Sequence, residues 1–387
     1  MCVLESSEEK REKDSLNTID LQDKPVDKKR TKGVSKMSAA KQEAKKTEEP
    51  INWDVVEKYL RNSLKGLPNG KMHVKKFSEG YSNLTYLLSI DNWEGVLRRP
   101  PFGEVPAKAH DMEREYRMLE KVNPVFPLAP QPYVYCDDRE IMDKHFYVME
   151  KKQGVVIDAE LPASYGSSEE AGPLISKTVI QTLVNLQAID YKEAGLQDMG
   201  KPEGFLQRQV NGWIRRYEAS KTETIPDLEE LEEWLKSNVP NNPETTIVHN
   251  DFKLNNMVLD EKDPGKAVGI LDWELSTIGD PLSDLGSTVA YWGAANDPDM
   301  GINIVTDQPG FFSRREFVEE YAKLSGRDVS GIEYYVTFGF YKLAVILQQI
   351  HYRWKIGEMQ DDRFGELNFA VANLIDMANQ TRNGQLL

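Results

Sequence analysis

The pattern of hydrophobic and polar positions divides the chain into a short strand-rich part and a longer helical part. In the first part, apolar residues at helical spacing follow Asn52, a favourable N-cap residue, so a helix is predicted there. Runs rich in β-branched and aromatic residues predict strands at His73–Phe77, Leu84–Ile90, Gly95–Arg99 and Phe146–Met149. A charged amphipathic helix over Ala107–Val122 completes a small sheet that carries one helix.

From about Ser167 onward, the apolar positions recur every three or four residues, as in helices that bury one face. The predicted helices are Leu174–Ile189, Leu206–Tyr217, Leu228–Leu235, Pro281–Tyr291, Arg314–Leu324, Tyr334–Ile356 and Phe364–Ala378. A short β segment around residues 247–272 interrupts them. The predicted fold class is therefore α+β and bilobal, with a small N-terminal β-sheet lobe at residues 51–150 and a larger, mostly helical C-terminal lobe at residues 151–387.

Residues 1–50 differ from both lobes in composition. They contain no Phe, Trp or Tyr, whereas 12 of them are Lys or Arg and 11 are Asp or Glu. Such a segment cannot bury enough apolar surface to offset the entropy that it would lose on ordering. We therefore expect residues 1–50 to be a disordered charged tail.

The bulk charge and the cysteines argue against several classes of protein. A net charge of -15 disfavours nucleic-acid binding, because that affinity comes largely from Lys and Arg that neutralise phosphates. The two cysteines, Cys2 and Cys136, predict neither a disulfide framework nor a metal cluster. No stretch approaches the roughly 20 apolar residues that cross a bilayer. The first residues lack an apolar signal core, so a cytoplasmic location is expected, and the oligomeric state stays open.

The candidate chemistry lies in the β segment. His249, Asp251 and Asn256 form the pattern H-x-D-x-x-x-x-N, and a second acid, Asp272, follows after a stretch of turn-forming residues. If the residues between Asn256 and Asp272 pair as a hairpin, these two side chains return to the same end. One amide oxygen and one carboxylate would then converge, which suits Mg²⁺, a cation that prefers oxygen ligands.

These are the parts that phosphoryl transfer from ATP requires. Magnesium ligands lie near the nucleotide phosphates, and a carboxylate orients the attacking hydroxyl and accepts its proton. Asp251 is the candidate for that carboxylate, with Asn256 and Asp272 as metal ligands. His249 is expected to be structural, holding the loop by hydrogen bonds. The alternative is that these residues only fill turns; the agreement of spacing, hairpin and second acid favours the catalytic interpretation.

Two features of the first lobe fit a nucleotide site. The turn that contains Gly80, Ser82 and Asn83 could cover phosphates with its backbone N–H groups, although a single glycine is also typical of an ordinary turn. Arg98 lies on the strand where a protein kinase carries its phosphate-binding lysine, and a guanidinium can hold anionic phosphates. Glu115 is its candidate helix partner; a solvated charge pair is the alternative.

The segment after Asp272 is expected to be chiefly structural. Gly279, Asp280 and Pro281 form a turn and a helix start, with acidic residues in the first turn of the helix. Asp280 is also a candidate to brace the catalytic loop by hydrogen bonding.

Taken together, these residues resemble the aminoglycoside/choline-kinase-like phosphotransferases. Within them, the similarity is closest to the kinase-like domain at the N-terminus of acyl-CoA dehydrogenase family members ten and eleven. The block LDWELSTIGDPLSDL at residues 271–285 carries most of this resemblance. Shorter similar segments are VLRRPP at 96–101, KAH at 108–110, FYVME at 146–150 and QRQV at 207–210.

The resemblance implies a bilobal protein-kinase-like fold with ATP and Mg²⁺ as cofactors. It implies that Asp251 is the catalytic base, that Asn256 and Asp272 bind magnesium, and that Arg98 with Glu115 replaces the nucleotide lysine and its partner. It also implies that the linker around Met149 and Glu150 contacts adenine, mainly through backbone groups.

Three positions depart from the family pattern. Asn250 replaces the usual glycine between His and Asp, Asn255 replaces an acidic residue or glycine, and Gln187 replaces a frequent histidine. None of these changes removes a catalytic group.

The predicted function is an ATP-dependent phosphotransferase that acts on a hydroxyl of a small molecule. The resemblance suggests a hydroxyacyl-CoA-like metabolite as the acceptor, in preference to an aminoglycoside. The predicted helix at Tyr334–Ile356 is the candidate substrate wall, with His351, Tyr352, Arg353 and Trp354 as possible contacts. The alternative function is a non-catalytic nucleotide-binding or regulatory module; the intact Asp251, Asn256 and Asp272 argue against it.

Overall fold

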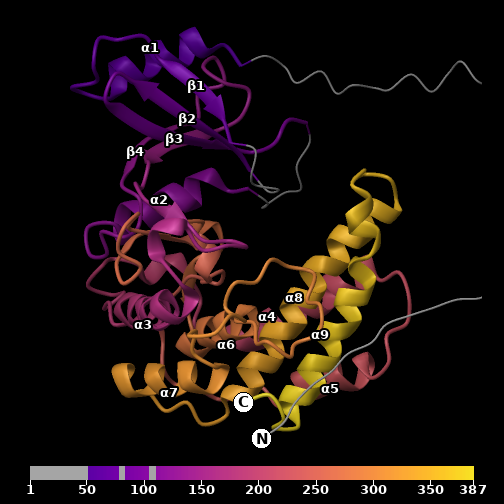
Figure 1. The fold of residues 1–387 in the computed structure, drawn as a ribbon. Coiled ribbons are helices and arrows are strands. Elements are labelled where there is room, and N and C mark those ends of the chain that lie inside the picture. Colours follow the sequence, from indigo (N-terminus) through magenta and orange to yellow (C-terminus); the bar gives the residue numbers. More distant parts are fainter. Residues whose placement is uncertain (1–50, 78–82, 104–109) are drawn as a thin grey trace, which may run out of the picture. The chain divides into compact units, whose positions relative to one another are not determined.

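The computed structural model describes residues 51–77, 83–103 and 110–387 (Figure 1). Three expectations fall outside these ranges: the charged tail at 1–50, the residues Gly80 and Ser82 of the proposed phosphate loop, and the start of the helix predicted from Ala107.

The N-terminal lobe is built on a five-stranded antiparallel sheet with the order β1-β2-β3-β5-β4. The strands are β1 (His73–Lys76), β2 (Leu84–Ile90), β3 (Trp93–Arg99), β4 (Pro132–Cys136) and β5 (Phe146–Glu150). β4 was not predicted, because Pro132 starts it and prolines precede it in the chain. Proline is tolerated there, since β4 is an edge strand and Pro132 is its first residue.

Two helices cover the sheet from opposite faces. α1 (Trp53–Ser63) begins after Asn52, whose side chain accepts from the Val55 N–H as predicted. Its apolar residues share a core cluster with Leu97 of β3, whereas Val96 belongs to the cluster that α2 (Met112–Val122) enters. Successive side chains of a strand point to opposite faces, so β3 is buried on both sides.

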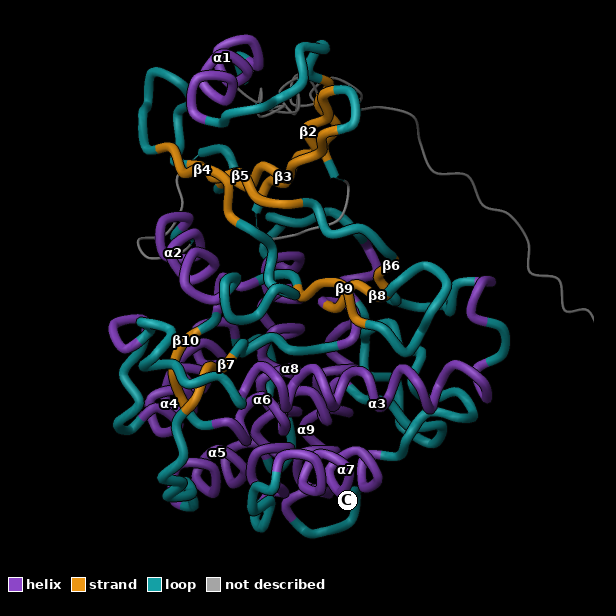
Figure 2. Tube along the Cα trace, turned by 90° about the vertical axis from the view of Figure 1, so that its left-hand side faces the viewer, coloured by secondary structure: helices purple, strands orange, loops and turns teal. Residues whose placement is uncertain are grey.

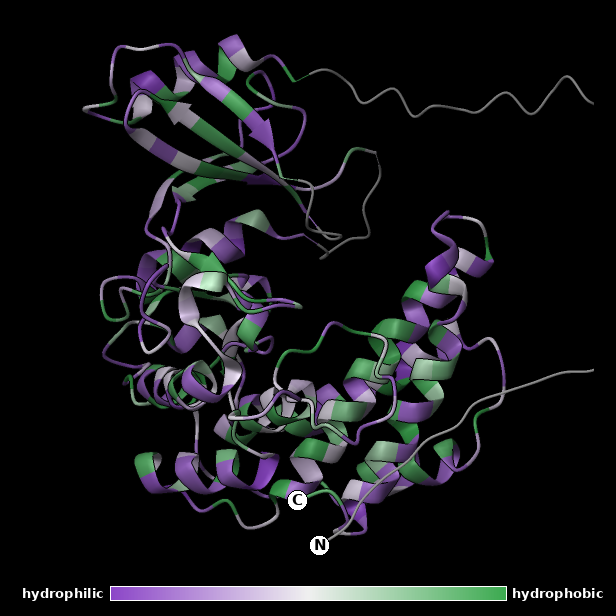
Figure 3. Cartoon of the chain, in the orientation of Figure 1, coloured by the Kyte–Doolittle hydropathy of each residue, from purple (hydrophilic) through white to green (hydrophobic). Residues whose placement is uncertain are grey.

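The C-terminal lobe is mostly helical and is organised around α8 (Figure 1). Its helices are α3 (Ser168–Gln187), α4 (Phe205–Ser220), α5 (Leu228–Ser237), α6 (Pro281–Tyr291), α7 (Arg314–Ser325), α8 (Ile332–Lys355) and α9 (Leu367–Arg382). α8 contacts α4, α6 and α9 along its length. Figure 3 shows hydrophobic residues interspersed with hydrophilic ones along α8 and α9, as expected for helices that bury one face.

In the C-terminal lobe, the starts of two helices differ from the prediction by three residues or more. α3 starts six residues before Leu174 and contains Pro173 in its interior, where a proline normally argues for a helix boundary. α9 starts at Leu367 because the residues before it form a short 3₁₀ turn, Asp362–Gly365.

Short strands in this lobe position the chemistry (Figure 2). β8 (Met257–Leu259) pairs with β9 (Ala267–Ile270), with Met257 opposite Ile270, so the predicted hairpin is confirmed. β6 (Val155–Val156) adds to its outer side. β7 (Thr246–Val248) pairs with β10 (Thr277–Gly279) and leads into the catalytic motif.

α6 and α8 cross at two glycines. A methyl group added at Gly286 would lie 2.4 Å from the carbonyl carbon of Tyr335, and one at Gly339 would lie 2.6 Å from the Gly286 oxygen. The two backbones are therefore in direct contact at this point, which only residues without a Cβ permit.

We expect Gly286→Ala to lower the free energy of unfolding by about 1–3 kcal/mol, because the methyl group must push α8 away. The control is Gly212→Ala on α4, where the added Cβ would meet only a side-chain atom at 3.9 Å. That change should stabilise by about 0.5–1 kcal/mol, since alanine is the better helix former. Urea denaturation of both variants would measure this, and equal effects would contradict the close crossing.

Candidate active site

The catalytic loop, residues 249–256, joins β7 to β8 and holds Asp251 and Asn256 against each other. The amide nitrogen of Asn256 donates to Oδ2 of Asp251 at 2.8 Å and to the Asp251 carbonyl oxygen at 2.9 Å. The amide oxygen of Asn256 is therefore the atom that could face a cation. The Asp251 side chain is 19% exposed, so a substrate group could reach it.

Lys253 is part of this site, although the sequence analysis did not select it. Its Nζ lies 3.1 Å from Oδ1 of Asp251 and 4.9 Å from the ring centroid of Tyr291. Burial works to lower its pKa, but Tyr291 and Asp251 outweigh this and raise the pKa above its ordinary value. The signal that could have identified Lys253 is its place two residues after Asp251, inside the motif.

Asp284 of α6 binds the backbone of the catalytic loop by two hydrogen bonds. Its carboxylate accepts from the N–H of His249 at 2.6 Å and from the N–H of Asn250 at 2.7 Å. Asp284 is fully buried, and burial raises its pKa to about 6 even though both hydrogen bonds favour the charged form.

His249 contributes by its position in the core. Its ring is fully buried, and Nε2 donates to the Leu271 carbonyl oxygen at 3.0 Å, which ties the loop to the end of β9. Burial lowers the pKa of the imidazole, so the ring is neutral with its proton on Nε2. These contacts match the structural role expected for it.

Asn250 fits the loop where relatives were expected to carry glycine. Its φ is +65°, in the left-handed region that glycine and asparagine tolerate best. Its side chain also donates to the Leu275 carbonyl oxygen at 2.9 Å. This departure from the family pattern therefore costs the loop little.

Asp280 does not brace the catalytic loop. It caps α6 by accepting from the Leu282 N–H at 3.0 Å, and it also accepts from Asn242 at 2.8 Å and from the Tyr335 hydroxyl at 2.7 Å. The expectation for Asp280 is corrected to Asp284, which lies one helical turn further along and faces the loop.

Asp272 reaches the same end of the hairpin as Asn256. The Leu271 N–H donates to the Asn256 carbonyl oxygen at 2.8 Å, just beyond the pairing of Met257 with Ile270. Asp272 has a φ of +68°, and its carboxylate Oδ1 accepts from Arg98 at 3.0 Å.

Arg98 joins the two lobes by binding three carboxylates. Its guanidinium lies 2.5 Å from Glu115 of α2, 3.0 Å from Asp272 and 3.5 Å from Glu274. Burial would lower the pKa of Arg98, but the surrounding acidic groups raise it well above its ordinary value. Burial also raises the pKa of Glu115, against the effect of Arg98. The predicted pairing of Arg98 with Glu115 is therefore present in the structure.

Asn83 connects the first lobe to Glu274, two residues after Asp272. Its amide nitrogen donates to Glu274 at 2.6 Å, and its oxygen lies 2.7 Å from Nδ1 of His110. Glu274 and His110 were not selected from the sequence, because contacts between residues so far apart in the chain leave no local pattern. The side chain of Asn83 is therefore engaged in holding the two lobes together.

The predicted linker between the lobes begins with Met149 and Glu150, the last two residues of β5. Met149 is buried in the core, and Glu150 accepts from the Gln131 N–H at 3.0 Å and pairs with Lys152 at 2.9 Å. The Glu150 N–H donates to the Gln131 carbonyl oxygen at 2.8 Å. An adenine contact through this N–H would have to displace that hydrogen bond.

The site has the donors that magnesium needs. Within residues 51–77, 83–103 and 110–387, no three His, Cys, Asp or Glu side chains are grouped as a metal site. Magnesium commonly binds through one or two carboxylates together with substrate phosphates and water. Asn256 and Asp272 supply two oxygen donors, and the carboxylates around Arg98 outnumber its single positive charge. The residues present therefore fit the ion.

Three of the four α8 residues predicted to contact substrate, His351, Arg353 and Trp354, have partners within their own lobe. His351 donates to the Phe364 carbonyl oxygen at 3.0 Å and packs against Trp354, and Arg353 pairs with Glu358. The α8 residue that approaches the catalytic loop is Lys342, whose Nζ lies 3.4 Å from the Asn250 carbonyl oxygen.

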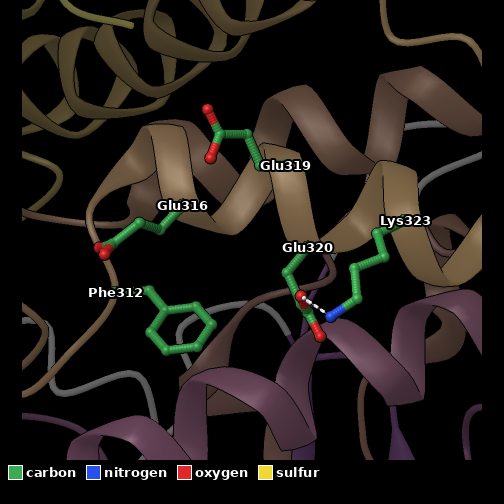
Figure 4. Close-up of a pocket in the computed structure, with 5 residues that line it drawn as sticks. All are labelled: Phe312, Glu316, Glu319, Glu320 and Lys323. Carbon is green, nitrogen blue, oxygen red and sulfur yellow. Dashed lines mark hydrogen bonds and ion pairs between the residues drawn. The ribbon is translucent and has the colours of Figure 1, made fainter.

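A small cavity of about 280 Å³ lies on α7 (Figure 4). Its lining residues are Phe312, Glu316, Glu319, Glu320 and Lys323, none of which belongs to the catalytic loop. In the described part of the chain, no helix is long and apolar enough to cross a membrane.

Comparison with known proteins shows which sequences the chain resembles. A model of the phosphotransferase enzyme family matches residues 73–317. The chain is 31% identical over 334 residues to acyl-CoA dehydrogenase family member 10 of Mus musculus, covering 84% of this chain and 31% of the mouse protein. It is 32% identical over 314 residues to member 11 of Gallus gallus, covering 78% of this chain and 40% of the chicken protein. The chain thus spans less than half the length of these relatives.

Solved structures show the same fold. A Ralstonia eutropha protein assigned to the aminoglycoside phosphotransferases has a TM-score of 0.74 at 27% identity, over 87% of this chain and 99% of that one. Choline kinase from Cryptosporidium parvum has a TM-score of 0.56 at 14% identity, with the same coverage of 87% and 99%. An aminoglycoside phosphotransferase in ternary complex with AMP-PNP and hygromycin B has a TM-score of 0.54 at 17% identity, over 85% and 99%. The fold is the bilobal kinase-like α+β fold that was predicted.

The Asp284 brace can be tested by Asp284→Asn. The amide offers one acceptor atom where the carboxylate offers two, so one buried backbone N–H loses its partner. We expect the free energy of unfolding to fall by about 1–3 kcal/mol. Asp198→Asn, at an exposed carboxylate on the surface, is the matched control and should change little.

The pH dependence of stability in the native protein and in Asp284→Asn gives a second test. The folded-state pKa of Asp284 is about 6, above the ordinary 3.8, so the folded form takes up the proton first as pH falls. This group destabilises the fold most above pH 6, and that penalty disappears below about pH 4. The stability gap between the native protein and Asp284→Asn should therefore shrink as pH rises from 4 to 7. A gap that widens would show that the folded-state pKa is depressed.

Proposed function

The chain belongs to the phosphotransferase enzyme family, and we propose that it transfers the γ-phosphoryl group of ATP to a hydroxyl group of a small molecule. One observation carries the proposal. Asp251 and Asn256 are hydrogen-bonded to each other, while Asp272 lies at the same end of the hairpin and binds Arg98. This arrangement supports roles for Asp251 as the base, for Asn256 and Asp272 as metal donors and for Arg98 as the cation that binds phosphate.

In this reaction, Asp251 orients the acceptor hydroxyl and takes its proton. The hydroxyl oxygen forms a bond to the γ-phosphorus, the bond to the bridging oxygen breaks, and ADP leaves with the electron pair. Lys253 lies 3.1 Å from Asp251, where its charge would also stabilise the transferring phosphoryl group.

Asn256 and Asp272 would hold Mg²⁺, which neutralises charge that develops on the phosphates. Arg98, which pairs with Glu115 and Asp272, would bind the nucleotide phosphates. Glu115 orients Arg98, and Asn83 donates to Glu274. Gly80 and Ser82 would cover the nucleotide phosphates with their backbone N–H groups. The linker at Met149 and Glu150 would bind adenine.

The acceptor that we propose is a hydroxyacyl-CoA-like or related hydroxylated metabolite. The curated relatives carry acyl-CoA dehydrogenase names, and this chain matches less than half of each. A phosphotransferase domain linked to such an enzyme would act on a related compound. An aminoglycoside acceptor is less consistent with the site, because the cation Lys253 flanks Asp251.

Substitution of Asp272 and of Asp251 should have different effects on MgATP binding and on turnover. Asp272→Asn should weaken magnesium-dependent ATP binding as well as turnover, because Asp272 acts on the metal–nucleotide complex. Asp251→Asn should spare MgATP affinity and lower the rate by roughly 10²–10⁴, the range for loss of a general base. Calorimetry with MgATP and an ATP-consumption assay over a metabolite library would measure both. Near-normal turnover in Asp251→Asn would contradict the mechanism, and no turnover in the native protein would favour a binding module.

Arg98 is tested separately by nucleotide titration. Arg98→Ala should weaken ATP binding strongly, whereas Arg98→Lys should retain part of it, because the charge survives and the planar fork does not. Lys75→Ala, on the exposed side of β1, is the control and should bind ATP normally. Unchanged ATP affinity in a folded Arg98→Ala variant would reduce Arg98 to a link between the lobes.

A further inference from the structure

Helices α4 and α8 lie side by side in the C-terminal lobe, and both views show their proximity (Figures 1 and 2). Lys342 of α8 ties this pair of helices to the catalytic loop. Its Nζ donates to the Ser287 hydroxyl at 3.1 Å and to the Asn250 carbonyl oxygen at 3.4 Å. Asn250 directly precedes Asp251, so Lys342 contacts the catalytic loop next to the candidate base.

Lys342 has no carboxylate partner within ion-pair distance among the described residues. Burial lowers the pKa of its ammonium group; Asp284 and Asp251 oppose this, while Arg216 and Lys253 add to it. A partly buried cation without a counter-ion is destabilising, so an anion would be favourable at this position.

A second cation stands on the same aromatic ring. The guanidinium of Arg216 lies 4.4 Å from the ring centroid of Trp213, and Nζ of Lys342 lies 5.7 Å from the same centroid. The side chain of Arg216 is exposed, so a ligand can reach it, and within the described residues that side chain forms no ion pair or hydrogen bond. Partial desolvation lowers its pKa, with Arg215 adding to the effect.

The indole itself has an unused donor. Trp213 is only 8% exposed, and its Nε1 is buried without a hydrogen-bond partner in the described part of the chain. A buried donor in a native protein normally has a partner, so an unpaired one indicates a missing group. Two unpaired cations and one unpaired N–H thus meet at a single tryptophan beside the catalytic loop.

Packing alone could account for a stacked arginine on a tryptophan, since such pairs are common. It does not account for a second cation on the same ring, because the charge of Arg216 lowers the pKa of Lys342 further. The overall charge of -15 makes this local excess of positive charge more distinctive. An anionic group that accepts from both cations would remove the repulsion.

We propose that Arg216, Lys342 and Trp213 form a subsite for an anionic group of the acceptor, so that the enzyme phosphorylates hydroxy compounds carrying a carboxylate or a phosphate. This inference rests on the proposed function for the identity of the bound molecule as an acceptor. The subsite would select against polycationic acceptors and would hold the hydroxyl near Asp251.

The first experiment tests anion binding without turnover. Melting temperatures are compared in sodium sulfate and in sodium chloride at equal ionic strength, for the native protein, Arg216→Ala, Lys342→Met and the double variant. Sulfate should stabilise the native protein more than the double variant. Lys323→Met, which removes a surface lysine paired with Glu320, is the control and should behave as the native protein does. Equal sulfate stabilisation in the native protein and the double variant would overturn the subsite.

The second experiment measures turnover on matched acceptors: a hydroxyalkanoate, its CoA thioester and its uncharged amide. The free acid supplies a carboxylate and the thioester supplies phosphates, so the two sources are distinguished. An anionic acceptor should have a KM about tenfold or more below that of the amide, as expected for hydrogen bonds to a charged group. In Arg216→Ala and Lys342→Met that KM should rise by a similar factor, with little change in kcat.

The outcomes separate the two proposals. Sulfate binding that depends on Arg216 and Lys342, without any turnover, would retain the subsite and reject the kinase function. Turnover on the uncharged amide with the same KM in every variant would retain the kinase function and reject the subsite.

Discussion

The contact between Arg98 and three carboxylates is the interaction on which the site depends. Glu115 comes from α2, Asp272 follows β9, and Glu274 lies in the next turn, so the guanidinium joins both lobes. Arg114, beside Glu115, strengthens this connection by donating to the carbonyl oxygens of Glu274 and Ser276. Burial raises the pKa of Glu115 to about 7, and Asp272 with Glu274 still carries more negative charge than one guanidinium neutralises. A divalent cation bound to nucleotide phosphates would offset this excess.

A second constraint sets the position of Asp251, the carboxylate proposed to act as the base. Asp251 belongs to a loop whose backbone N–H groups donate to Asp284. Asp284 lies on α6, which contacts α8 where Gly286 meets Gly339. The packing of the C-terminal lobe therefore reaches the loop through two hydrogen bonds. Because the brace is a backbone contact, the identity of residue 250 is constrained mainly by its left-handed conformation, which asparagine tolerates.

The parts that sequence reasoning predicted are those with a local signature. His249, Asp251, Asn256 and Asp272 follow one another within a motif and a hairpin, and the pairing of Met257 with Ile270 is as expected. Arg98 and Glu115 could be matched because a strand and a helix with known roles carry them. The contacts of Asn83 with Glu274 and of Lys342 with Asn250 join residues that are distant in sequence, so only the tertiary structure reveals them. Asp280 and Asp284 carry the same charge at the start of the same helix, α6. The sequence does not show which way each side chain faces, so it could not predict that Asp280 caps the helix and Asp284 binds the loop.

The most direct test of the account is a crystal structure of the protein with Mg²⁺ and AMP-PNP. The account predicts a cation at about 2.0–2.1 Å from the amide oxygen of Asn256 and from the carboxylate of Asp272, the usual magnesium distance. It predicts that Arg98 contacts the phosphates and that Asp251 contacts neither the metal nor the nucleotide. A nucleotide bound without contact to Asp272, or a metal bound to Asp251 instead, would contradict the assignment of the two acids.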